Sequence, residues 1–139
     1  MGIDREEIMD RRTFLSGFAA AAGTFAILFP RFGLAHHGWG WATGDEFELT
    51  GVIKAVKLGN PHGEMTLDAK GDFAGEEWVV EIGQPWRNEQ AGLTVEKLAK
   101  GTEVTVHGHR SANPDAKLMK AEWLEIGGTK HDLYPDRES

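Results

Sequence analysis

Hydrophobic and polar residues alternate along most of this chain in a way that predicts a β-protein. Five segments show the period of two that is typical of half-buried strands: residues 46–58, 62–69, 76–83, 102–110 and 117–126. The positions expected to face inward are Phe47, Leu49, Ile53, Ala55, Met65, Leu67, Trp78, Val80, Ile82, Val104 and Val106. Gly51 interrupts the first segment, where a bulge or a tight bend is expected.

The pattern changes between the third and fourth strands. Residues 85–100 lack alternation, which predicts helical content that is broken around Gly92, with Thr94 as the N-cap of a second short piece. Three strands, a short helical segment and two strands within about 80 residues indicate an all-β fold, a five-stranded OB-like Greek-key barrel. An SH3-like barrel or a small β-sandwich is the alternative. Ligands of OB barrels bind on strands 2–3 and on the loops joining strands 1–2 and 4–5.

The first 35 residues have the features of an export signal. Arg11 and Arg12 precede Phe14 and Leu15, and a mildly apolar run follows at residues 18–29. The paired arginines resemble the twin-arginine signal, which predicts a periplasmic location. Small residues before Ala35 place the expected cleavage after it, so the mature chain would begin at His36.

Two alternatives to a cleaved signal remain open. The apolar run could be kept as an N-terminal anchor, although it is shorter than the ~20 residues that a span needs. It could also be an amphipathic helix, which its apolarity on all sides argues against. With cleavage we expect no membrane span, and a domain organisation of a signal at 1–35, a His/Trp segment at 36–45, the barrel at 46–127 and a loose polar tail at 128–139.

Composition narrows the classes of partner and of site. The chain has 22 acidic and 15 basic residues and a net charge of −7, and it contains no cysteine. Disulfides and thiolate metal sites are therefore excluded. An acidic chain without a basic stripe is expected to have no nucleic-acid partner.

The histidines are the residues most suited to a binding function. All six follow residue 35. His107 and His109 lie two residues apart on one predicted strand, opposite Val104 and Val106, so their side chains would project from one face about 6.6 Å apart. In an OB barrel the loops joining strands 1–2 and 4–5 are neighbours, so His62 at the start of the second strand would approach this pair. The three would then form one metal-binding patch, unless they are only polar surface residues.

His36 and His37 would become a chelating terminus after cleavage. A free N-terminal histidine binds one metal ion through its α-amine and its imidazole, the arrangement of the histidine brace of copper proteins. A cut after Leu34 would instead place a histidine third, as in the amino-terminal copper- and nickel-binding motif. The predicted ligands are thus His36, His37, His62, His107 and His109, and copper is favoured over nickel or zinc because affinity peaks at Cu(II). His131, in the expected tail, has no predicted role.

No arrangement of catalytic residues is evident, so we expect a binding protein and no enzyme. The chain has no nucleophile elbow, phosphate loop or zincin motif. Trp39 and Trp41 flank the first histidines and are expected to clamp that segment onto the barrel or to stack on a ligand. The alternative function is a metal-free accessory module that docks on another exported protein.

Several motifs resemble a family of small exported bacterial proteins without an established function. The mature start Ala35-His36-His37, the turn Asn60-Pro61-His62, the strand that begins Thr50-Gly51-Val52-Ile53 and the segment from Leu98 to Gly108 carry this resemblance. It departs after His37, where Gly38 and Trp39 replace the usual Ser-Phe, and after Pro85. The resemblance supports the OB-like fold and export, and it implies no particular ligand.

Overall fold

The structure is a computed structural model and describes residues 38–137, which fall within one compact unit. The signal at 1–35, its cleavage point and His36 and His37 lie outside the described residues. No helix within residues 38–137 is long and apolar enough to cross a membrane. The elements are β1 (Phe47–Lys57), β2 (Glu64–Ala69), the 3-10 turn η1 (Gly71–Phe73), β3 (Glu77–Glu81), α1 (Pro85–Gln90), β4 (Glu103–Arg110), β5 (Leu118–Ile126) and β6 (Thr129–Asp132).

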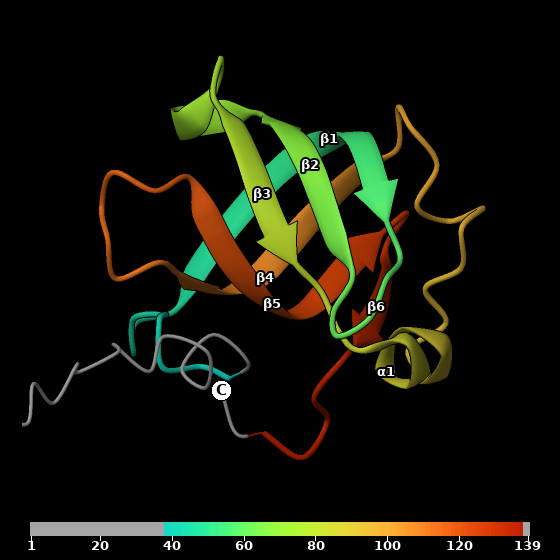
Figure 1. Ribbon diagram of the computed structural model, residues 1–139. Helices are drawn as coiled ribbons and strands as arrows, with labels where there is room; N and C mark the ends of the chain where they lie inside the picture. Colours follow the sequence, from blue (N-terminus) through green and yellow to red (C-terminus); the bar gives the residue numbers. More distant parts are fainter. Residues whose placement is uncertain (1–37, 138–139) are drawn as a thin grey trace, which may run out of the picture. The chain divides into compact units, whose positions relative to one another are not determined.

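Five of these strands form a closed barrel (Figure 1). The sheet runs in the order β3-β2-β1-β4-β5-β6, with antiparallel neighbours, and a parallel pairing of β3 with β5 closes it. Strand β6 extends β5 as a hairpin, and α1 lies beside β6 at one end of the barrel (Figure 1). The predicted all-β, OB-like five-stranded barrel with one short helix is confirmed.

The barrel interior contains the residues that the alternation placed there, with one exception. Leu49, Met65, Trp78 and Val106 are each at most 1% exposed, as are most of the other expected inward residues. Ala55 is exposed, because the β1–β2 register shifts between Ile53 and Ala55. The irregularity predicted at Gly51 therefore lies at Lys54.

Gly51 has a different role in β1. A Cβ added there would lie 2.8 Å from the carbonyl oxygen of Asp68 on β2. This glycine therefore allows the close approach of two strands, which is its other common use inside a sheet.

Two local predictions are wrong. Residues 94–100 form turns and no second helix; the hydroxyl of Thr94 accepts only a 3.3 Å bond from the Lys97 N–H. The expected loose tail contains β6, and His131 within it is 5% exposed, with Nδ1 2.7 Å from the Ala91 carbonyl oxygen. Burial against α1 gives these residues a packed position that their polarity did not indicate.

Candidate metal centre

His109 is buried on the outer side of the barrel wall. It is 2% exposed, and both ring nitrogens face oxygen acceptors. Nδ1 is 2.8 Å from the backbone carbonyl oxygen of Asp45, and Nε2 is 2.9 Å from Oε1 of Glu122. Oε1 of Glu46 lies 3.5 Å from the same Nε2. One ring nitrogen is thus held by the backbone, and the other faces two carboxylates.

This cluster is the one group with metal-ligand geometry that the structure shows among residues 38–137. The ligand atoms of Glu46, His109 and Glu122 lie within 4.8 Å of one another. Ligands bonded at about 2.1 Å to one ion lie at most about 4.2 Å apart. The side chain of Glu46 is 56% exposed, so it can move by the remaining few tenths of an ångström.

The hydrogen bond from Nδ1 of His109 to the Asp45 carbonyl oxygen is of the kind that orients metal-binding histidines. A ligating histidine usually donates its second N–H to a carbonyl or carboxylate, which sets the tautomer and the ring orientation. Here Nδ1 donates to Asp45 and leaves Nε2 for a ligand. Glu46 and Glu122 were not predicted as site residues, because each reads as an ordinary surface acid in the sequence.

The patch expected from His62, His107 and His109 does not form, so this interpretation is corrected. The ring of His107 stacks on Trp123, with centroids 3.5 Å apart and planes at 12°, and its Nδ1 is 3.3 Å from Glu48. His62 faces Glu81, with Nδ1 3.5 Å from its carboxylate. Each of the three histidines therefore pairs with its own carboxylate.

A β-bulge brings Glu122 to His109. On β5 the register shifts opposite His107 and Gly108, so that Trp123 pairs with His107 and Ala121 with Gly108, leaving Glu122 as the extra residue. Strict alternation would have turned Glu122 inward together with Leu124. Gly108 is necessary at this place, because a Cβ there would lie 1.9 Å from the carbonyl oxygen of Lys120.

The sequence contains a trace of this bulge. Met119 and Ala121 are buried at odd positions of β5, whereas Leu124 is buried at an even one. The inward parity therefore changes between residues 121 and 124, which is what one inserted residue produces. Lys120 and Glu122, both nearly buried, are outward residues covered by other parts of the chain.

Basic side chains balance the buried carboxylates. Arg137 Nε is 2.5 Å from Oε1 of Glu122, and the Lys120 ammonium is 2.6 Å from Oε1 of Glu81. The ring of Trp39 covers both cations, 4.0 Å from the Arg137 guanidinium and 5.0 Å from the Lys120 ammonium. The metal-free centre is thus a neutralised polar layer beneath an indole ring.

Trp39 also holds the N-terminal segment on the barrel. Its ring meets His109 and Tyr134 edge to face, at 5.5 and 5.2 Å. The backbone that follows it is bonded to the barrel, because the Thr43 N–H donates to Arg110 and the Ala112 N–H donates to Trp41. The predicted clamping role of Trp39 is confirmed, and it fastens the segment directly over His109.

The covered position of Tyr134 gives a prediction about pH. Burial raises the pKa of its phenol above the ordinary value of 10, and the nearby Arg87 guanidinium partly opposes this. The pKa of Tyr134 is raised only in the folded state. The packing of the neutral phenol therefore contributes fully to the free energy of unfolding below pH 10, and this contribution is lost as the pH rises through the folded-state pKa. Tyr134 is the one tyrosine in the chain, so absorbance at 295 nm reports it alone among tyrosines.

We expect a titration midpoint above 10 in the folded protein and a lower one in Trp39→Ala, which uncovers the ring. Circular dichroism at each pH serves as the control for folding. A wild-type midpoint at or below 10, with the fold intact, would contradict the packing described for Trp39 and Tyr134.

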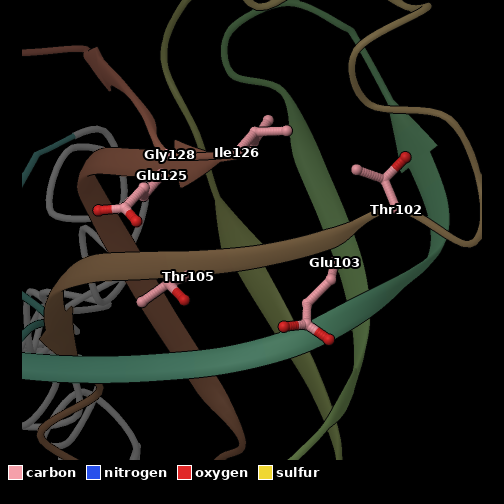
Figure 2. Close-up of a pocket in the computed structure, with 7 residues that line it drawn as sticks. Thr102, Glu103, Thr105, Glu125, Ile126 and Gly128 are labelled. Atoms are coloured by element: carbon pink, nitrogen blue, oxygen red, sulfur yellow. The ribbon is translucent and has the colours of Figure 1, made fainter.

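Two further cavities offer less to a metal. A cavity of about 390 Å³, between the loops joining β1–β2 and β4–β5, is lined by Trp41, His62 and Glu81 among others. A larger one of about 480 Å³ lies over β4 and β5, and Figure 2 shows Glu103 and Glu125 at its edges. The carboxylate of Glu103 pairs with the Lys70 ammonium, and no residue of the lining supplies a nitrogen ligand.

Several solved structures are partly similar to this chain. A chain of the Stn1–Ten1 complex of S. pombe matches with a TM-score of 0.47 and 17% identity, over 58% of this chain and 57% of that one. The mitochondrial single-stranded DNA-binding protein Rim1 of S. cerevisiae matches with a TM-score of 0.46 and 10% identity, over 60% and 93%. TiaS, in a complex with a tRNA and ATP, matches with 0.43 and 17%, over 58% and 18%.

This chain therefore spans little more than half of the Stn1–Ten1 chain and under a fifth of TiaS. No curated protein matches it significantly in sequence. At such identities the likeness concerns the fold and assigns no ligand.

The prediction that excluded a nucleic-acid partner for this chain is wrong. Proteins similar in fold include one that is a single-stranded DNA-binding protein and one solved with a tRNA. Net charge sums over the whole surface, whereas a binding face depends on its local residues. A net charge of −7 therefore does not remove nucleic acid from the possible partners of a barrel of this kind.

The fold and the site define a small OB-like barrel with a histidine–carboxylate cluster on its outer wall. The chain belongs to the Family of unknown function (DUF6152), whose model matches residues 29–119. That range contains all five histidines predicted as ligands and also Glu46. Glu122 lies beyond it, so the match covers two members of the three-residue cluster.

Proposed function

We propose that this chain is an exported periplasmic protein that binds one divalent transition-metal ion, with Cu(II) bound most tightly. The centre is His109 with Glu46 and Glu122, and the role is sequestration, delivery or sensing of the ion. The observation that carries the proposal is the geometry of His109: Nδ1 is held by the backbone of Asp45, and Nε2 faces two carboxylates.

The ligand types support this class of metal. One imidazole and two carboxylates suit Zn(II) and Cu(II), and for such sites affinity rises along the first row to Cu(II). The Asp45 carbonyl oxygen at Nδ1 fixes the ring orientation of His109 and leaves Nε2 directed at the two carboxylates.

His36 and His37 complete the proposal as further ligands. They lie three and two residues before Trp39, whose ring contacts His109. Three residues of extended chain reach about 10 Å, which is enough to bring an imidazole to the cluster. Cleavage after Ala35 would add the free α-amine of His36 to the ligands.

The test compares two neighbouring glutamates at the start of β1. Glu46, the residue before the strand, faces His109, whereas Glu48 within the strand contacts His107. Glu46→Gln should weaken Zn(II) binding about tenfold or more, since even residues that only support a metal ligand contribute 10- to 100-fold. Glu48→Gln removes the same charge and should bind as the wild type does. Calorimetry gives the affinities.

Native mass spectrometry of protein recovered after export, with and without one equivalent of Cu(II), tests the rest. We expect a mass that begins at His36 and one retained copper ion in the wild type. Equal losses in Glu46→Gln and Glu48→Gln, or no retained metal, would contradict the proposal.

The second candidate is a metal-free accessory module that docks on another exported protein. It is favoured by exposed apolar side chains at one end of the barrel, where Leu58 is 40% exposed and Val95 68%. Both line a shallow cavity of about 270 Å³ beside Pro85 and Leu93. Trp39 packs against His109 and Tyr134 within the chain and is not part of this surface.

A further inference from the structure

We infer that Arg137 is an internal competitor for the metal, so that binding of the ion displaces Arg137 and releases residues 135–137 from the centre. This inference rests on the proposed function, and it adds how the affinity of the site is set and how the site is coupled to a movable segment.

The competition follows from one shared oxygen atom. Oε1 of Glu122 accepts from Arg137 Nε at 2.5 Å and from His109 Nε2 at 2.9 Å. A metal ion held by Nε2 and Oε1 must lie between these two atoms. The Arg137 guanidinium would then lie within a few ångströms of a divalent cation. Because the two cations repel each other across a half-buried site, they cannot both use Glu122.

Arg137 supplies the positive charge beside Glu122 that a bound cation would supply in its place. The Glu122 side chain is 4% exposed, so it requires a positive partner at all times. In the absence of metal, the Arg137 guanidinium supplies that charge. With metal the ion supplies it, and the ion pair that holds Arg137 is lost.

The segment that contains Arg137 is anchored in two different ways. Leu133 is 1% exposed and its N–H donates to the Glu122 carbonyl at 2.9 Å, so this residue is fixed in the core. Beyond it, within the described residues, the one ion pair to the barrel is that of Arg137 with Glu122. Tyr134 keeps its own contacts, because its N–H donates to Oδ1 of Asp132 and its ring packs against Trp39 and the Arg87 guanidinium. Loss of the Arg137 pair therefore frees residues 135–137 and leaves Leu133 and Tyr134 in place.

Release of Arg137 also affects the Trp39 ring, which lies over the metal centre. The Arg137 guanidinium lies 4.0 Å from the Trp39 ring, and that ring packs against Tyr134. Metal binding is thus coupled to the loosening of residues 135–137 and of the Trp39 side chain that they contact. By linkage, a partner that binds residues 135–137 only when they are released would strengthen metal binding, and the metal would strengthen the binding of that partner by the same factor. Arg137 keeps the affinity of the isolated protein below what its ligands could provide.

The experiment measures Zn(II), chosen because an amino-terminal chelate prefers Cu(II) and Ni(II). Titrations compare the full chain as wild type, Arg137→Gln, Arg137→Lys and the control Lys100→Gln, which removes a positive charge from an exposed turn. Arg137→Gln should bind Zn(II) about five- to tenfold more tightly, the size of one partly exposed charge-assisted hydrogen bond. Arg137→Lys should fall between, and Lys100→Gln should match the wild type.

Hydrogen exchange at the Arg137 amide, whose N–H donates to the Tyr134 carbonyl oxygen at 2.9 Å, gives an independent readout. In the wild type, exchange should be slow without Zn(II) and fast with it; in Arg137→Gln it should be fast in both states. If the wild type binds Zn(II) while this amide stays protected, or if Arg137→Gln binds no more tightly than Lys100→Gln, the inference fails and the metal centre stands. If no variant binds Zn(II) and the wild type retains no Cu(II), the proposed function fails and the inference fails with it.

Discussion

Gly108→Ala is expected to lose about 3 kcal/mol of folding free energy. The added Cβ would lie 1.9 Å from the carbonyl oxygen of Lys120 and 2.9 Å from its carbon, and both are backbone atoms that cannot rotate away. The β4–β5 pairing must therefore open at the bulge. For a domain of about 100 residues this loss corresponds to a decrease in Tm of roughly 12 °C or more, measurable by thermal denaturation. Glu122 is positioned by the same bulge, so Zn(II) binding should fall as well.

The matched control is Gly44→Ala. Gly44 is exposed, and a Cβ there has no neighbour within 4 Å. Its Tm should change by no more than a few degrees, and a small increase is expected from the lower entropy of the unfolded chain. If the two substitutions had equal effects, the close approach of β4 and β5 at Gly108 would be wrong.

His109→Gln is expected to reduce Zn(II) affinity at least 100-fold and to cost about 2–3 kcal/mol of stability. The affinity falls because the only nitrogen ligand of the described centre is lost. The stability falls because the Glu122 side chain is 4% exposed and would lose its contact with Nε2 of His109. Titration with Zn(II) and chemical denaturation measure the two effects separately.

His107→Gln is the control for this prediction. His107 lies on the same face of β4, but it stacks on Trp123 and faces Glu48. Its replacement should leave Zn(II) affinity unchanged within about twofold. Should His107→Gln weaken binding as much as His109→Gln does, the ligand pair that the sequence suggested would be restored, and the cluster with Glu46 and Glu122 would be set aside.

The alternation of residues accounted for most of the barrel. Strand positions depend on the local pleat, in which neighbouring side chains point to opposite faces, so Leu49, Met65, Trp78 and Val106 could be placed inside from sequence alone. The same reasoning failed at Ala55, because a bulge in a barrel changes the parity of everything beyond it. It also failed for residues 128–139, where burial of His131 against α1 comes from contacts distant in sequence.

For the candidate metal centre, too, the sequence determined one part and the tertiary structure another. The sequence by itself excluded thiolate ligands, since the chain has no cysteine, and it identified His109 as one of five candidate histidine ligands. Only the tertiary structure decided that His109 pairs with Glu46 and Glu122 and that His62 and His107 stay apart. Glu46, His109 and Glu122 come from three different regions of the chain. They meet through strand pairing and one inserted residue, a register relation that no local pattern in any of the three segments contains.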